Sequence, residues 1–347
     1  MGAERYDGLF EQIRELVLCH SPSGAEEEID AFLLARLKAL GVEHRQDDAG
    51  NIVARIPGRD PGRALAITAH KDEIGCIVKR VNPDGTVEVR KLGGSFPWVY
   101  GEGVVDLLGD TATVSGVLSF GSRHVSHESP QKVHEEQLPL KWENAWVETK
   151  RSAEALASAG IRPGTRMVVG KHRKQPFRMG DYIASYALDD KAVAAVLLTL
   201  AEELREPAWD VYLAFTAKEE VGAIGAMYFS ARQKPDALIA LEISPKSREY
   251  PCGSDLAPVL VSQDSHGLYD EDLNRELAAA AQRAGVPCQH TILSQFGSDA
   301  SLTMKNGHVP RAACVGFPAD NTHGYEIAHL GAIDNCRRLL LAYCRNA

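Results

Sequence analysis

The stretch Val211–Ala226 places the strongest constraint on how this chain can fold. It begins with a short apolar run, partly β-branched and aromatic, which is typical of a buried strand. Where that strand should end, two adjacent carboxylates follow, Glu219 and Glu220, and then two glycines that allow a tight turn, Gly222 and Gly225. In an open α/β sheet, ligands bind at the carboxyl ends of the strands. The stretch therefore favours an α/β fold with these two carboxylates at a ligand site.

Taken alone, a Glu-Glu pair more often marks the solvated start of a helix, because acidic residues are rarely buried. However, two other apolar runs end in a similar way. Ala64–Ala69 leads into His70 and Asp72. Ala237–Leu241 leads into Glu242. Residues two apart on an extended chain share one side, so Asp72 can lie beside a metal-bound His70 and hydrogen-bond its second ring nitrogen. Taken singly, each element could be a capped surface histidine or a solvated strand end. Three such strand ends in one chain favour a ligand site instead.

Further candidates lie outside these strands. Asp189 and Asp190 directly precede an apolar helix expected over 192–204, where acids also serve simply as caps that complement the helix dipole. His323 follows the last expected strand, 312–316. Histidines and carboxylates without cysteine form a ligand set that suits Zn²⁺, Co²⁺ or Mn²⁺. Two such ions about 3.5–4 Å apart share a bridging carboxylate.

Charge, the length of apolar runs and cysteine content argue against several classes of partner and location. The chain has 347 residues and a formal net charge of −9, which disfavours nucleic acid or an anionic membrane as a partner. No apolar run reaches the roughly 18 residues of a membrane span, and the first residues lack the pattern of a signal peptide. Seven cysteines, an odd number without CxxC spacing, indicate reduced thiols and favour a cytoplasmic protein.

The length suggests two domains. From Cys76 to about Arg178, short β-like runs alternate with glycine-rich turns, whereas helix and buried-strand patterns occupy the rest of the chain. We therefore expect a discontinuous catalytic domain of residues 1–75 and 179–347, with an inserted β-rich domain of residues 76–178.

Two shorter patterns give local predictions. Ser23 and Glu26 have the spacing of a capping box, which predicts the start of a helix that Gly41 ends. The polar segment Phe296–Ser301 contains a glycine and is expected to be a loop that offers backbone contacts to a ligand.

As a set, these motifs resemble those of the glutamyl aminopeptidase (tetrahedral aminopeptidase) family of di-metal exopeptidases. The resemblance covers essentially the whole chain, and its most specific segments are Ser21–Gly24, Ala69–Gly75, Ala187–Lys191 and Phe215–Gly222. It implies a mixed-sheet α/β sandwich of the di-zinc aminopeptidase type, with an inserted small β-barrel-like domain that mediates dimerisation and assembly. One departure is Lys71, which stands where the family usually has an apolar residue.

By position, the resemblance also implies a ligand set for two divalent ions per subunit, with zinc expected first and cobalt or manganese as alternatives. His70 and Glu242 correspond to ligands of one ion. Glu220 and His323 correspond to ligands of the second ion, and Asp189 corresponds to the bridging carboxylate. Glu242 is a second departure, because this family more often has Asp at that position.

Three residues beside these ligands have other implied roles. Glu219 corresponds to the general base, Asp72 to the partner of the imidazole of His70, and Asp190 to an adjacent orienting residue. The peptide bond between Asp189 and Asp190 is often cis in the family. The implied activity is removal of N-terminal residues from short peptides by a water that two metals and Glu219 activate. The implied assembly is a homo-oligomer, from a dimer up to a dodecamer.

Three alternatives stay open at this point. A related di-metal amidohydrolase or deacylase would use the same ligands on a non-peptide amide and would accept blocked amines. A glycosidase needs two carboxyl groups that flank the bond, about 5–10 Å apart, for which the neighbours Glu219 and Glu220 are poorly arranged. A catalytically inactive relative that serves as a binding module would purify without metal.

Overall fold

The structure is a computed structural model that describes residues 3–122, 124–126 and 139–346. Within these residues the chain forms two compact units. One contains the chain up to Glu73 and from Gln175 onward, and the other is Ile74–Lys174. No helix among the described residues has both the length and the apolar character needed to cross a membrane.

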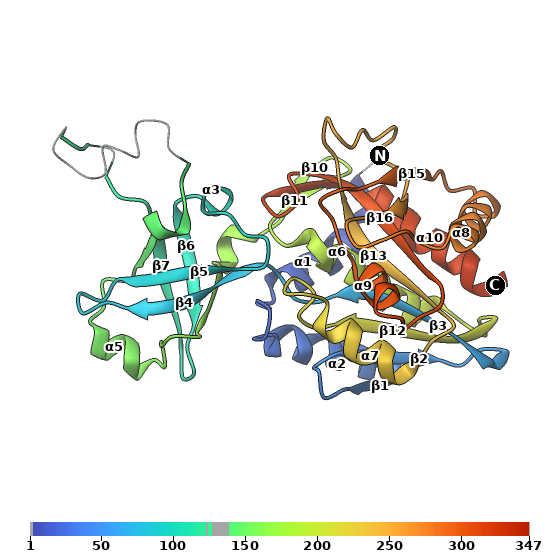
Figure 1. Cartoon of the computed structure of the whole chain (residues 1–347), viewed down its shortest axis with the longest axis horizontal. Helices are drawn as coiled ribbons and strands as arrows, with labels where there is room; N and C mark the ends of the chain where they lie inside the picture. The colour runs from blue at the N-terminus through green and yellow to red at the C-terminus, as the bar shows by residue number, and fades with distance from the viewer. Residues whose placement is uncertain (1–2, 123, 127–138, 347) are drawn as a thin grey trace. The chain divides into compact units, whose positions relative to one another are not determined.

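The first unit is built on a mixed sheet, which Figure 1 shows with its helices. Its eleven described strands are β1 (Glu43–Gln46), β2 (Ile52–Ile56), β3 (Asp60–His70), β10 (Phe177–Met179), β11 (Tyr182–Ser185), β12 (Trp209–Thr216), β13 (Ala237–Pro245), β14 (Val259–Gln263), β15 (Gln289–Ile292), β16 (Ala312–Asp320) and β17 (Glu326–His329). The central strands β12, β3, β13 and β16 are neighbours in that order and run parallel. Antiparallel strands flank them, with β2 beside β12 and both β17 and β14 beside β16.

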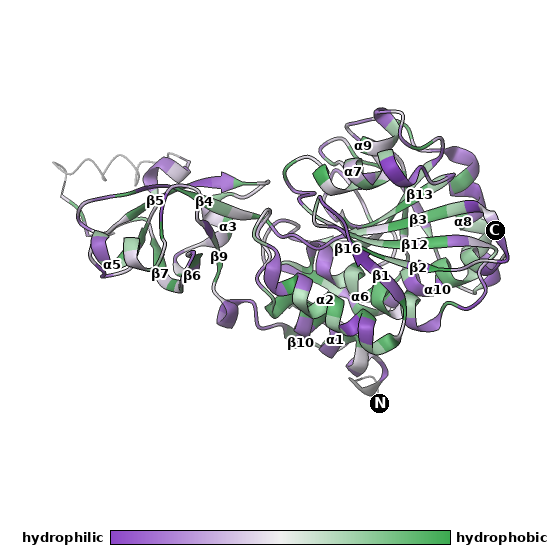
Figure 2. Ribbon diagram, turned by 90° about the horizontal axis from the view of Figure 1, so that it is seen from below, coloured by the Kyte–Doolittle hydropathy of each residue, from purple (hydrophilic) through white to green (hydrophobic). Residues whose placement is uncertain are grey.

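Helices cover both faces of this sheet, as Figure 2 shows. On one face lie α1 (Asp7–Leu18), α2 (Glu27–Leu40), α6 (Leu188–Glu203) and α10 (Leu330–Asn346), with α8 (Glu271–Arg283) packed on α10. On the other face lie α7 (Ile224–Gln233) and α9 (Asp299–Lys305). A short 3-10 helix, η1 (Ala3–Tyr6), precedes α1.

The two faces carry separate hydrophobic cores. Along β3, Leu65 and Ile67 belong to the larger core beneath α6, whereas Ala66 belongs to the smaller core beneath α7 and α9. Successive strand residues point to opposite faces, so a strand buried on both faces must be apolar at every position. This double burial explains the continuous apolar runs that the central strands show in the sequence.

The second unit is a closed barrel within its described residues. Its six strands follow the order β4 (Gly75–Val81), β5 (Val87–Leu92), β8 (Trp146–Glu148), β7 (Thr113–Ser119), β6 (Gly103–Leu108) and β9 (Arg166–Val169). The barrel closes where Cys76 of β4 pairs with Met167 of β9. Its short helices are α3 (Pro97–Tyr100), η2 (Trp142–Asn144), α5 (Ala153–Ser158) and η3 (Lys171–Arg173). The mixed α/β sheet and the small barrel confirm the predicted fold class.

Two local predictions were wrong in part, and the reasons are physical. Gly41 ends α2, as predicted, but the start of that helix differs. Helix α2 begins at Glu27 without a side-chain cap, because the hydroxyl of Ser23 donates to Asp72 Oδ2 at 2.6 Å instead. The segment Phe296–Ser301 is only partly a loop. Ser298 caps α9, which starts at Asp299, so half of the segment makes hydrogen bonds within its own helix.

Candidate metal centre

The predicted site residues meet at the carboxyl edge of the parallel strands. His70 is the last residue of β3 and pairs with Thr216, the last residue of β12. In β13, Ala240 pairs with Thr68, so Glu242 lies level with His70 across the two strands. The parallel register thus brings the ends of three apolar runs to one place, as the strand-end pattern predicts.

The loop after β12 is held by one buried amide. Asn51 Oδ1 accepts from the N–H of Ala217 at 3.0 Å, and Asn51 Nδ2 donates to the carbonyl of Gly225 at 3.0 Å. Any Cβ at position 225 would lie 2.1 Å from Asn51 Oδ1, and Gly222 has φ of +113°. Glycine is therefore required at both positions, and the tight turn fixes the intervening backbone. This loop carries Glu219 and Glu220 out of the strand and back toward the sheet edge.

Asp189 and Asp190 do not serve as helix caps. The N-cap of α6 is Ala187, and both aspartates have non-helical backbone angles although they fall inside the helix boundaries. The peptide bond between them is cis. Asp189 Oδ1 lies 3.0 Å from His70 Nε2, and Asp189 Oδ2 lies 3.5 Å from His323 Nε2. One carboxylate therefore faces two imidazoles that are far apart in the sequence.

The side chains form two overlapping groups that could each hold a metal ion. In one group, ligand atoms of His70, Asp189 and Glu220 all lie within 4.8 Å of one another. In the other group, the same holds for His70, Asp190 and Glu242. His323 adjoins the first group, because its Nε2 is 3.7 Å from Glu220 Oε2. All five predicted ligands thus lie in one cluster.

Asp190 lies closer to this cluster than expected. The family resemblance implies an orienting role for it, and its Oδ2 accepts from the backbone N–H of His70 at 3.1 Å. Its other oxygen, Oδ1, is buried and has no hydrogen-bond partner within the described residues. An unsatisfied buried carboxylate oxygen is costly, and a cation would satisfy it. The donor set and this orphaned oxygen both fit divalent metal.

Asp72 contacts His70 differently from the prediction. The Nδ1 of His70 lies 3.0 Å from the main-chain carbonyl of Asp72, whereas the carboxylate Oδ1 is 3.6 Å away. The carboxylate of Asp72 instead accepts from the backbone N–H groups of Glu219 at 2.9 Å and Glu220 at 3.3 Å, and from the hydroxyl of Ser23. The residue therefore orients both the imidazole and the loop after β12.

The electrostatics of the cluster favour cations. Burial, followed by the negative charges of neighbouring carboxylates, raises the pKa values of four acids well above their usual range: Asp190, Glu219, Glu220 and Glu242. Burial alone would lower the pKa of His70, but the nearby carboxylates of Asp189 and Asp72 outweigh burial and raise it well above its ordinary value. An environment that raises the pKa values of its acids and of its imidazole favours the binding of positive charge, which a divalent ion also supplies.

Glu219 is arranged differently from the other carboxylates. Its side chain makes no hydrogen bond or ion pair within the described residues, although its backbone N–H is held by Asp72. A carboxylate held in place but free at its oxygens can accept a proton from a water or return one to a leaving group.

Sequence reasoning missed several buried charged groups at this site. Glu326 accepts from the backbone N–H groups of Asp189 and His323, each at 3.0 Å. Glu73 pairs with Lys191 at 2.9 Å. Asp299 accepts from the hydroxyl of Thr216 at 2.6 Å, and burial raises its pKa to about 6. Only the short spacing from His323 to Glu326 offered any local signal, because the other pairs join distant segments.

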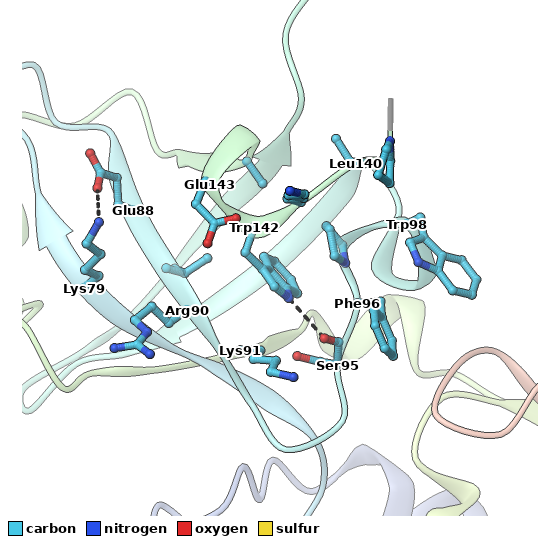
Figure 3. A pocket seen from close by; sticks show the side chains of 15 residues that line it. Lys79, Glu88, Arg90, Lys91, Ser95, Phe96, Trp98, Leu140, Trp142 and Glu143 are labelled. Atoms are coloured by element: carbon cyan, nitrogen blue, oxygen red, sulfur yellow. Dashed lines mark hydrogen bonds and ion pairs between the residues drawn. The ribbon is translucent and has the colours of Figure 1, made fainter. Parts of the chain in front are cut away.

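The barrel unit has a pocket of about 930 Å³, which Figure 3 shows, but it is a different kind of site. Aromatic and basic side chains line it, among them Arg90, Lys91, Phe96, Trp98 and Trp142. None of the predicted ligands lines this pocket.

The chain is similar to known proteins over most of its length. The model of the M42 glutamyl aminopeptidase family matches residues 50–339. The glutamyl aminopeptidase of Lactococcus lactis is 26% identical, over 92% of this chain and 90% of its own length. The lysyl aminopeptidase of Pyrococcus furiosus is 23% identical, over 96% of both chains. The solved structure of the Pyrococcus horikoshii TET1 peptidase has a TM-score of 0.87 at 22% identity, and covers 98% of this chain and 100% of that chain.

Proposed function

Since the chain belongs to the M42 glutamyl aminopeptidase family, we propose that it is a metal-dependent aminopeptidase that removes N-terminal residues from short peptides. The observation that carries this proposal is the cluster in which one carboxylate, Asp189, faces both His70 and His323 with further carboxylates around them. Such a cluster of oxygen and nitrogen donors is the ligand set of a co-catalytic pair of divalent ions.

We assign the ligands by position and by geometry. His70 and Glu242 would hold one ion, Glu220 and His323 would hold the second, and Asp189 would bridge the two. Zinc suits this set, and cobalt or manganese suits it as well.

When bound, a pair of divalent ions lowers the pKa of a shared water and polarises the carbonyl of the substrate. The residues of the chain supply the proton transfers and the orientation. Glu219 would accept the proton of the attacking water and then donate it to the departing amine. Asp72 would hold the backbone of Glu219 in place during both transfers, because its carboxylate already accepts that N–H. The free α-amine of the substrate would bind a carboxylate beside the metal centre.

The test is hydrolysis by chelator-treated protein after Zn²⁺, Co²⁺ or Mn²⁺ is restored. The substrates are a panel of aminoacyl-anilides, each with a free and an N-acetylated α-amine. We expect no turnover without metal, and turnover of free-amine substrates alone with metal. Hydrolysis of the acetylated series would identify a deacylase instead, and activity that survives chelation would reject the metal mechanism.

The panel also addresses the preferred N-terminal residue. The relatives bear the names of glutamyl and lysyl aminopeptidases, which act on opposite charges. A preference for acidic residues would require a cation in the substrate pocket, as Lys305 or Arg311 could provide. Arg311 instead pairs with Asp270 and Glu276. The charge preference therefore has to be measured with both acidic and basic anilides.

We further propose that the chain works as a homo-oligomer in the cytoplasm. The P. horikoshii TET1 peptidase can assemble into a tetrahedron or a large octahedral shell. By analogy, residues 1–75 and 179–347 would form the catalytic domain, and residues 76–178 would mediate dimerisation and assembly up to a dodecamer. All seven cysteines are free thiols, which suits a reducing compartment. Sedimentation velocity of the intact chain tests the assembly, and a monomer at micromolar concentration would contradict it.

A further inference from the structure

We propose that Glu326 is a positioning residue of this site, which fixes Asp189 and His323 for the ion that these two residues share. The inference rests on the proposed function, because it concerns the same metal centre. Glu326 lies at the start of β17 and is 1% exposed. Its Oε2 accepts from the backbone N–H of Asp189, and its Oε1 accepts from the backbone N–H of His323, each at 3.0 Å. One side chain thus ties together two ligands that are 134 positions apart, as their residue numbers show.

The backbone at both ends of this bridge needs such support. His323 has φ of +60°, in the left-handed region that residues with a side chain rarely adopt. Ala187, two residues before Asp189, has φ of +59°, and Asp189 itself departs from helical geometry. Unusual backbone conformations persist where surrounding contacts hold them in place, and they gather at functional sites. The two oxygens of Glu326 provide such contacts to both segments.

A carboxyl group with an acceptor at each oxygen suits this arrangement. It accepts hydrogen bonds at both oxygens, whereas the amide of glutamine accepts at one and donates at the other. A glutamine here would therefore turn its NH₂ group toward one of the two backbone N–H groups. Asp72 repeats the arrangement on the other side of the site, where it accepts from the backbone N–H groups of Glu219 and Glu220. The site is thus held by two buried carboxylates, each of which joins the backbones of two functional residues.

The first experiment is a metal titration of the chelator-treated protein, with zinc in competition with a chromophoric chelator. The variants are Glu326→Gln and, as a matched control, Glu202→Gln, which removes the same charge from an exposed position of α6. His323→Ala identifies which binding step belongs to the second ion. We expect Glu326→Gln to weaken that step by about 10–100-fold, the usual effect of losing a group that orients a metal ligand. The zinc affinity of the other step in Glu326→Gln, and both zinc affinities of the control, should stay within about threefold of those of the unmodified chain.

A second readout does not depend on metal. Hydrogen exchange of the metal-free protein, followed by mass spectrometry, reports on the peptides that contain Asp189 and His323. We expect both to be protected in the unmodified chain and to exchange faster in Glu326→Gln. If that variant fails to fold, Glu326→Asp takes its place, because a shorter carboxylate keeps the charge but reaches only one N–H.

Three results would overturn the inference. These are unchanged zinc affinity in a folded variant, equal loss at both binding steps, and rapid exchange of both peptides in the unmodified chain. If the unmodified chain binds no zinc, the proposed function fails, whereas the exchange measurement still decides whether Glu326 holds the two segments.

Discussion

Replacing Lys71 with methionine would show how the buried charge beside the site is balanced. Lys71 is fully buried, and its Nζ lies 2.5 Å from Glu26 Oε2 and 2.5 Å from Asp30 Oδ1. The side chain of Glu26 is 3% exposed and that of Asp30 is 16% exposed. Methionine preserves the length of the side chain, but it leaves two carboxylates without their cation.

Breaking a buried ion pair by removal of one partner costs about 3–5 kcal/mol. Protonation limits the cost for each acid. Adding a proton at pH 7 to a carboxylate with a pKa of about 4.3 costs about 3.7 kcal/mol, and the neutral acid then avoids any larger penalty. Asp30 keeps some contact with water and should contribute less than Glu26. We therefore expect Lys71→Met to lower the free energy of unfolding by about 3–5 kcal/mol at pH 7.

The loss should also depend on pH in a defined direction. In the unmodified chain, burial and the charge of Asp72 already raise the pKa of Glu26, and Lys71 opposes both effects. Without Lys71 the pKa of Glu26 in the folded state rises further above its unfolded value. Stability then falls as pH increases from the unfolded pKa toward the folded one. At pH 5 the loss should be smaller than at pH 7 by up to about 2.7 kcal/mol for each stranded acid.

The assay is equilibrium unfolding in denaturant, with chelator present and at one protein concentration. Lys38→Met is the matched control, because Lys38 lies exposed on the same helix as Asp30, and it should change stability by less than about 0.5 kcal/mol. Adding Glu26→Gln and Asp30→Asn to Lys71→Met should restore much of the loss. A loss below about 1 kcal/mol at pH 7, or an equal loss at pH 5, would refute the reasoning, since neither fits an uncompensated buried charge.

Three further outcomes are expected. Glu219→Gln should bind metal as before but lower the turnover rate by about 10²–10⁴-fold, and retained activity would reject its role as the base. Zinc binding should release protons, and the zinc affinity should increase as pH rises, because the pKa values of Glu220, Glu242 and His70 are raised and protons compete with the ion. Calorimetry in buffers of different ionisation enthalpy would detect the released protons. A binding enthalpy that does not depend on the buffer would contradict this prediction. Gly225→Ala should destabilise the chain by about 1–3 kcal/mol in thermal unfolding, because its Cβ would overlap Asn51, whereas Gly8→Ala meets no atom within 4 Å and should be neutral or slightly stabilising.

The sequence predicted those parts of the site that follow from the geometry of a parallel sheet. A strand buried on both faces must be apolar throughout, so a polar residue such as His70 or Glu242 marks its end. Parallel strands then bring such ends to one edge, and no further information is needed to group them. The same logic predicted that Glu219 and Glu220 lie near this edge, because the glycines that follow them indicate a turn at the end of the strand.

The sequence could not predict partners that depend on long-range contacts. Ser23 and Glu26 match a local capping pattern, yet Ser23 binds Asp72, which is far along the chain, and Glu26 binds Lys71. In both cases a buried charged group from a distant segment supplies a partner that the local pattern does not contain. Lys71 therefore stood out only as a departure from a family pattern. Its acidic partners, Glu26 and Asp30, lie in a distant segment of the chain, directly before and within α2.

Glu326 shows a second kind of limit. The spacing of three residues from His323 to Glu326 is only a weak signal, because acidic residues at such positions are usually solvated. The proposed role of Glu326 depends on the direction of the backbone N–H groups of Asp189 and His323, and Asp189 has non-helical backbone angles within α6. Backbone direction at irregular positions is not encoded in hydrophobic periodicity, which is the main signal that a single sequence offers.

The most direct test of the central claim is a crystal structure of the zinc-loaded protein with anomalous scattering measured at the zinc edge. The account predicts two peaks per subunit about 3.5–4 Å apart, with the carboxylate of Asp189 between them. His70 should lie against one peak and His323 against the other. A single peak, or two peaks that do not share Asp189, would contradict it.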